Sequence, residues 1–198
     1  DVVTATITKT VKNVSETATG NNEIVTLVVE NQDQYRNIVT ENGTLTITPR
    51  PVTITADSDS KEYDGTPLTN DSYTNTDLAE GDEIERVTVT GSQTVVGSSA
   101  NVPSDAVIMD GEEDVTDNYT IDYVNGELEV TQTTRELRIV ANSTSWQYDS
   151  EIHSDGGYTV TYGDESYTVA AGGSATLSTG DVVTATITKT VKNVSETA

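Results

Sequence analysis

The chain has no cysteine and no phenylalanine, and it has one tryptophan, one methionine and one histidine among 198 residues. Without cysteine no disulfide can form, and the redox compartment cannot be read from thiols. No apolar run approaches the roughly 20 residues of a membrane-spanning helix. No signal peptide or anchoring tail is recognisable, so any export signal is expected outside these residues. We predict no membrane insertion.

Basic residues are also scarce. Ten Lys and Arg stand against 33 Asp and Glu, which gives a formal net charge of -23 at pH 7. Binding to phosphate backbones needs clustered Lys and Arg, so nucleic acid is excluded as a partner. Anionic membrane surfaces are disfavoured for the same reason. An acidic surface keeps long polymers apart in solution and can collect divalent cations.

Groups for catalysis are missing as well. The only histidine, His153, stands beside Ser154 and Asp155 in a polar stretch and is expected to be an exposed loop residue. No glycine-rich phosphate loop, zinc-ligand spacing or Gly-x-Ser-x-Gly motif occurs. The sequence therefore predicts no catalytic residue, no enzyme activity and no cofactor, with calcium as the one open possibility.

The apolar residues are mainly Val and Ile in short runs that alternate with Thr, a pattern typical of β-strands. Val2–Val11 alternates cleanly and predicts a half-buried strand, whereas Ile24–Val29 predicts a strand buried on both sides. Asn42-Gly43 and Asn125-Gly126, each between two apolar runs, predict hairpin turns. No helical periodicity lasts longer than two turns. Further strands are predicted at Val52–Ala56, Ile84–Thr90, Val95–Ala100, Ala106–Met109 and Leu137–Ala141.

The strongest signal is an internal repeat: Asp1–Ala18 and Asp181–Ala198 are identical, at an offset of 180 residues. Such an offset lies far beyond the periods of helical solenoids. A weaker likeness relates Ala56–Asp64 to Ala141–Asp149, and Asp117–Tyr119 to Asp33–Tyr35. The chain therefore reads as a ring opened at an arbitrary point.

Closing this ring gives two homologous repeats. Repeat A is residues 52–131, and repeat B is split into residues 135–180 and residues 1–48. Each has the length of one immunoglobulin-like sandwich. We predict an all-β protein of tandem immunoglobulin-like β-sandwiches in a linear array. Its segments are 1–48, 52–131 and 135–198, the last ending in the copy of residues 1–18.

Three arrangements of the split repeat B are open. Neighbouring repeats of one polymer can complete each half, or separate chains can exchange halves. In the third, the halves are unpaired and disordered. The duplicated Asp181–Ala198 argues against exchange between chains, because it competes for the same strand position.

Repeat A resembles a known family along nearly its whole length. Lys61-Glu-Tyr-Asp-Gly-Thr-Pro-Leu68, Gly81-Asp82, Val87–Gly91, Asn118–Ile121 and Gly126–Leu128 resemble the YDG-type and MBG-type immunoglobulin-like repeats of bacterial surface proteins. Repeat B departs from the pattern at Trp146-Gln147 and Ser150 and carries an insertion at Gly156–Tyr162. The resemblance implies a sandwich fold, an extracellular cell-surface location on Gram-positive bacteria, and a spacer or adhesive role. It implies no catalytic residue.

An acidic loop is the best candidate for a metal site. Calcium takes six to eight oxygen ligands, which a dense run of carboxylates and carbonyls can supply. In a chain this acidic, the alternative is a solvated loop. The candidate ligands are Asp110, Glu112, Glu113, Asp114 and Asp117, with Asp57 and Asp59 as further contributors.

Lys61 raises a second hypothesis, an isopeptide cross-link to Asn118 or Asn125, as in some surface immunoglobulin-like domains. It needs an uncharged, strongly desolvated lysine. The alternative is an exposed lysine whose stem covers Tyr63. Repeat B has Trp146 at the position of Lys61, so both repeats cannot share the bond.

Aromatic residues complete the candidates. Tyr63 and Tyr148 are expected to fill the ends of the sandwiches with their hydroxyls bonded to backbone. Trp146 is expected to pack near a joint, with a platform for a sugar as the alternative. The function predicted is a structural repeat of an extracellular fibre or adhesin stalk. Its alternatives are an adhesive module for a glycan or host protein, and a rod stiffened by calcium.

Overall fold

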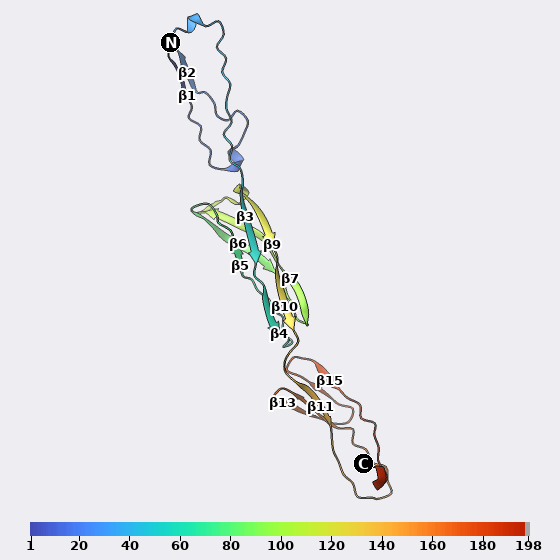
Figure 1. Ribbon diagram of the computed structural model, residues 1–198. Coiled ribbons are helices and arrows are strands. Elements are labelled where there is room, and N and C mark those ends of the chain that lie inside the picture. The colour runs from blue at the N-terminus through green and yellow to red at the C-terminus, as the bar shows by residue number, and fades with distance from the viewer. Residues whose placement is uncertain (197–198) are drawn as a thin grey trace. The chain divides into compact units, whose positions relative to one another are not determined.

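The computed structural model describes residues 1–196, so Thr197 and Ala198, the end of the predicted segment 135–198 and of the repeat, lie outside it. The predicted all-β class is confirmed (Figure 1). Helical structure within residues 1–196 is limited to four 3-10 turns, Val14–Glu16 (η1), Gln32–Gln34 (η2), Thr116–Asn118 (η3) and Val194–Glu196 (η4). None of the helices in this range is long and apolar enough to cross a membrane.

Contacts divide the chain into two units. The first contains residues 1–57, 70–90 and 101–126, and the second contains residues 58–69, 91–100 and 127–198. This division runs through the predicted repeat A, because its strands contribute to both units. The tandem arrangement and the boundaries of repeats A and B stay predictions.

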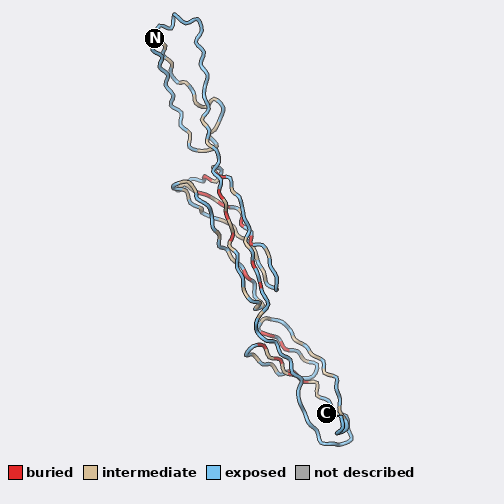
Figure 2. The backbone as a smooth tube through the Cα atoms, viewed as in Figure 1, coloured by how far each residue is buried: buried red, intermediate tan, exposed pale blue. Residues whose placement is uncertain are grey.

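Residues 1–49 form a sparse sheet without a core. Strand β1 (Val3–Thr6) pairs antiparallel with β2 (Thr26–Val29), and Val3 lies opposite Val29. No residue from 1 to 51 is buried, and this stretch is pale blue and tan in Figure 2. The predicted burial of Val2–Val11 and Ile24–Val29 is therefore wrong. The alternation makes an apolar face, but no second layer covers it.

Strand β3 (Arg50–Ala56) is the centre of the first unit and confirms the strand predicted at Val52–Ala56. It pairs antiparallel with β5 (Tyr73–Asn75) and parallel with β9 (Tyr119–Val124). Val52 and Ile54 are at most 2% exposed. Val52 packs with Ile108 and Tyr119, so this sheet buries its apolar face against a second one.

The second sheet has the strand order β4 (Asp59–Glu62), β10 (Gly126–Thr131), β7 (Gly97–Asp110) and β6 (Asp82–Thr90). A short strand, β8 (Glu113–Asp114), is added on β7. The strands predicted at Val95–Ala100 and Ala106–Met109 are one long strand. Asp105, at φ 51°, interrupts its alternation. A left-handed residue within a strand bends it without ending it.

The two predicted Asn-Gly hairpins are wrong. β9 and β10, on either side of Asn125-Gly126, pair with different partners, β3 and β4, both in parallel. A Cβ on Gly126 would lie 2.4 Å from the carbonyl oxygen of Asp57. The glycine is needed because two backbones approach closely where the chain passes between sheets. Gly43 instead bridges Asn22.

The second unit has a core of its own around β12 (Tyr158–Tyr162). This strand lies antiparallel between β11 (Leu137–Ala141) and β13 (Glu165–Val169). Tyr158 and Val160 are completely buried. Gly156–Tyr162, an insertion in the sequence comparison of the two repeats, therefore supplies the central strand of this core.

Strand β14 (Ser174–Thr176) pairs with β15 (Val182–Thr184), which lies in the second copy of the 18-residue repeat. Val183 and Ile187 pack against the cluster around Tyr158. The second copy of the repeat is thus attached to a core, in the orange and red part of Figure 1.

Candidate binding groove

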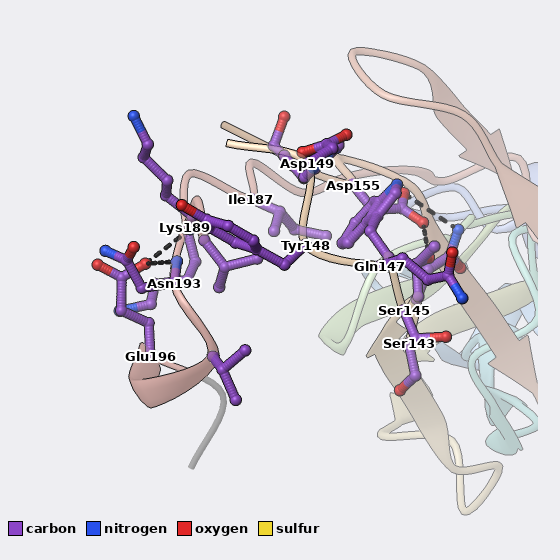
Figure 3. A pocket seen from close by; sticks show the side chains of 18 of the residues that line it. Ser143, Ser145, Gln147, Tyr148, Asp149, Asp155, Ile187, Lys189, Asn193 and Glu196 are labelled. Carbon is purple, nitrogen blue, oxygen red and sulfur yellow. Dashed lines mark hydrogen bonds and ion pairs between the residues drawn. The ribbon is translucent and has the colours of Figure 1, made fainter. Parts of the chain in front are cut away.

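A groove of about 840 Å³ lies in the second unit, beyond the end of β11 (Figure 3). One wall is the stretch 141–155 and the other is the stretch 187–196. The walls are joined at His153 and Val191, which exchange two backbone hydrogen bonds of 2.9 and 3.0 Å. Most lining side chains are polar; Trp146, Tyr148 and Ile187 supply large apolar surfaces.

The aromatic part of the groove is a stack of Trp146 on His153. The two ring centroids are 4.9 Å apart and the planes differ by 12°. His153 Nε2 lies 2.9 Å from Asp149 Oδ1, and the histidine side chain is only 22% exposed. The prediction of an exposed His153 is therefore wrong, because Trp146 covers its ring. The stack holds Trp146 with 41% of its surface exposed.

The loop that carries these rings is held by Asp155. Its carboxylate accepts hydrogen bonds from the Thr144 hydroxyl at 2.5 Å and from the Gly157 amide at 2.8 Å. These bonds, that of Thr144 first, lower the pKa of Asp155 below its ordinary value. Asp149 is similar: the Glu151 amide, and after it His153, lowers the pKa of its carboxyl. Both carboxylates are structural acceptors.

The opposite wall is shaped by Glu196. Its carboxylate accepts hydrogen bonds from the backbone amides of Lys192 and Asn193 at 2.6 and 3.0 Å. These two bonds, that of Asn193 first, lower the pKa of Glu196. Figure 3 shows Asn193 and Glu196 together at one end of the groove, with Lys189 above them.

The groove is suited to binding. Trp146 and Tyr148, 41% and 65% exposed, offer ring faces, while hydroxyls and amides along the loop offer hydrogen bonds. Aromatic faces with neighbouring polar groups suit a sugar ring or an extended peptide. The carboxylate of Asp149 already engages His153, so this histidine serves the loop structure.

No family model, curated protein or solved structure matches this chain. The likeness of Lys61–Leu68 and Gly126–Leu128 to YDG-type and MBG-type repeats therefore stays a resemblance of the sequence.

The acidic loop predicted to hold calcium is a tight β-turn with outward carboxylates. Asp110 lies opposite Glu113 in the pairing of β7 and β8, and Val115, 4% exposed, points into the core. Asp110 Oδ2 is 2.7 Å from Lys12 Nζ, so one carboxylate already has a cationic partner. Asp114 accepts from the Thr116 amide at 3.0 Å.

Glu112 and Asp117 are exposed. Nowhere in residues 1–196 do three acidic or histidine side chains converge closely enough to hold a metal ion. The calcium site stays a prediction.

The residues predicted for the isopeptide bond have other partners. Lys61 Nζ is 2.8 Å from Asp64 Oδ1, and this ion pair lowers the pKa of Asp64. The side-chain amide of Asn118 donates to Asn13 at 2.9 Å. Asn125 is exposed between β9 and β10. Lys61 and Asn118 belong to different units, so the cross-link stays a prediction.

The two tyrosines differ from their predicted roles. The hydroxyl of Tyr63 donates to Asp181 Oδ2 at 2.9 Å, not to backbone. Tyr148 is 65% exposed, and its hydroxyl accepts from Ser150 at 3.2 Å. The groove itself was missed by the sequence reasoning. Its only signal is that the single Trp and the single His are seven positions apart, at 146 and 153.

Proposed function

We propose that this chain is a structural repeat of an extracellular fibre or adhesin stalk, a spacer that projects a binding tip from the cell surface. The observation that carries the proposal is the identity of residues 1–18 and 181–198. Residues that recur without change at a period of one domain pair are expected in a polymer of repeats. The resemblance of repeat A to stalk repeats supports the same function.

The distribution of charge supports a spacer. Residues 52–131 contain 19 acidic and 2 basic residues, whereas residues 1–48 contain 6 acidic and 3 basic residues. Segments of strong negative charge repel each other at distances up to the Debye length of about 8 Å at physiological salt. A stalk whose repeats A carry the charge resists bundling with its neighbours.

The test is made on the cells that encode the chain. An antiserum against it is expected to label intact cells, with an antiserum against a cytosolic protein as the control. Removing copies of the 180-residue period from the gene is expected to bring a label at the tip closer to the cell wall, with binding by the tip preserved. Labelling only after permeabilisation, or a distance that does not change, would contradict the proposal.

The alternative function is an adhesive module for a glycan or host protein, and the groove favours it. The exposed faces of Trp146 and Tyr148 beside a row of hydroxyls are the observation behind it. Trp146→Ala and Tyr148→Ala are expected to abolish binding on a glycan array, whereas Val95→Ala, an exposed valine outside the groove, leaves it unchanged. Equal binding by all three variants would exclude this groove as the adhesive site.

A further inference from the structure

The two copies of the 18-residue repeat occupy different environments. In the second copy, Val183 and Ile187 pack against the cluster that contains the buried Tyr158. The same residues of the first copy, Val3 and Ile7, are 62% and 53% exposed. The same sequence therefore has a buried apolar face in the second copy and an exposed one in the first. In the second copy the cluster around Tyr158 covers this face.

The two copies also use opposite edges of the same strand. In the first copy the carbonyl oxygen of Val2 accepts from the Glu30 amide at 2.9 Å. In the second copy the carbonyl oxygen of Asp181, which is the counterpart of Asp1, accepts a hydrogen bond from the Leu177 amide at 2.9 Å. Neighbouring residues of a strand direct their backbone groups to opposite edges. One copy of this strand can therefore pair with β2 and β14 at the same time.

β11 also has an apolar face that is exposed, whereas the corresponding face of β3 is buried. Within residues 52–131, Val52 and Ile54 of β3 are at most 2% exposed. β9 pairs with the edge of β3, and Val52 packs with Ile108 and Tyr119. The counterparts of Val52 and Ile54 in β11, by the alignment of Ala56 with Ala141, are Leu137 and Ile139. These are 45% and 44% exposed. The pairing of β11 involves β12 alone within residues 1–196, so its second edge is open.

The residues that correspond to β9 lie in the first 48 residues. Tyr35 is the counterpart of Tyr119 by the alignment of Asp33–Tyr35 with Asp117–Tyr119. Ile38 is the counterpart of Ile121 by the alignment of Asn42-Gly43 with Asn125-Gly126, so repeat B has one extra residue between Tyr35 and Ile38. Tyr119 is 8% exposed, whereas Tyr35 and Ile38 are 45% and 42% exposed. Leu137 in one half of repeat B and Tyr35 and Ile38 in the other are thus exposed, whereas their counterparts Val52, Tyr119 and Ile121 pack in one cluster within residues 52–131.

The net charges of residues 1–48 and of residues 135–180 are small enough for the two segments to come into contact. Residues 1–48 carry a formal charge of -3 and residues 135–180 one of -4, out of -23 for the chain. Repulsion between two weakly charged surfaces is small at physiological salt. The strongly acidic residues 52–131 take no part in the contact.

We propose that a second copy of this chain docks its residues 1–48 on residues 137–177 of the first, so that Asp1–Ala18 displaces the competing Asp181–Ala198. Residues 19–48 favour this exchange, because they bring the paired strand β2 and the face around Ile38, which Asp181–Ala198 lacks. β11 then gains a parallel partner around Ile38, as β3 has β9. By the parallel pairing of β4 with β10, residues 45–48 lie along the groove wall at 144–147. The inference deepens the proposed function, on which it rests, by naming the partner: another copy, joined head to tail.

Sedimentation velocity of the full chain tests the docking. The wild type is expected to form oligomers that grow with concentration. Leu137→Asp removes the accepting face and Ile38→Asp the donating one; because both side chains are exposed in the monomer, neither change is expected to unfold it. Each variant alone is expected to associate at least about tenfold more weakly, since a buried unpaired charge is costly. Val95→Asp is the control and associates like the wild type.

A mixture of the two variants gives the sharpest outcome. Leu137→Asp still donates residues 1–48 and Ile38→Asp still accepts them, so the mixture is expected to form dimers and nothing larger. Because the chain lacks cysteine, a Leu137→Cys, Ile38→Cys double variant is expected to give a ladder of disulfide-linked oligomers. A wild type that stays monomeric up to about 1 mM, or a mixture without dimers, would overturn the docking. Surface labelling of cells is independent of this result, so the proposed function can stand if the docking fails.

Discussion

A permuted chain would join the two halves of repeat B within one molecule. Residues 49–180 followed by residues 1–48 contain every segment of the sequence once, since residues 181–198 duplicate residues 1–18. The new bond, Gly180 to Asp1, joins the same two residue types as Gly180 to Asp181 does now. We expect this 180-residue chain to be more stable than the original, because the exposed faces of the halves can cover each other.

The size of the gain follows from the exposed fractions. Leu137, Ile139 and Tyr35 are 44 to 45% exposed, whereas their counterparts Val52, Ile54 and Tyr119 are at most 8% exposed. Complete burial of such a side chain contributes about 1.5–3 kcal/mol, so about two-fifths of this on three side chains gives about 2–4 kcal/mol. For a chain of this size the melting temperature should rise by about 5–15 °C.

The assay is urea unfolding at neutral pH, followed through the fluorescence of Trp146, the only tryptophan. Ile38→Asp is expected to remove most of the gain in the permuted chain and to change little in the original chain, where Ile38 is 42% exposed. A permuted chain that unfolds at the same or a lower urea concentration would refute the reasoning that the halves are complementary.

Three further predictions concern single positions. Tyr158→Phe removes a hydroxyl that donates to the Gly173 carbonyl at 2.9 Å and accepts from the Ala185 amide at 3.1 Å. The change should destabilise the second unit by about 1–3 kcal/mol in urea, and an unchanged midpoint would contradict this. The Thr144 hydroxyl lowers the pKa of Asp155, so the ionised Asp155 carboxylate stabilises the fold at neutral pH, and this stabilisation is lost as the pH falls through the lowered pKa. Asp155→Asn should flatten this part of the profile of stability against pH. Identical profiles for the variant and the wild type would contradict this role of Asp155. Gly126→Ala places a Cβ 2.4 Å from the Asp57 carbonyl oxygen and should cost about 2–3 kcal/mol in thermal unfolding. An unchanged melting temperature would contradict the close approach of the two backbones.

Individual strands were predictable because alternation is a local property. Val52–Ala56 and Ile84–Thr90 were predicted as strands and are β3 and β6. The same rule predicted burial for Val2–Val11, where the structure buries nothing. Alternation shows that a face is apolar; it does not show whether another layer lies on it.

Turns and strand partners were predicted less well. Asn125-Gly126 has the sequence of a hairpin turn, but its flanking strands pair in parallel with β3 and β4. The glycine is there because Asp57 passes close by, a contact between residues about 70 positions apart in sequence. Local turn chemistry cannot distinguish these two uses of glycine.

The sequence by itself determined the β-class and the repeat of residues 1–18 at 181–198. The exclusion of nucleic acid through the charge stays a prediction. Only the tertiary structure decided which copy of the 18-residue repeat has its apolar face buried. Val183 packs on the core around Tyr158 and Val3 does not, although both valines occupy the same position of the 18-residue repeat. Burial is a property of the surface that meets a strand, and in the second copy that surface is supplied by residues distant in the chain.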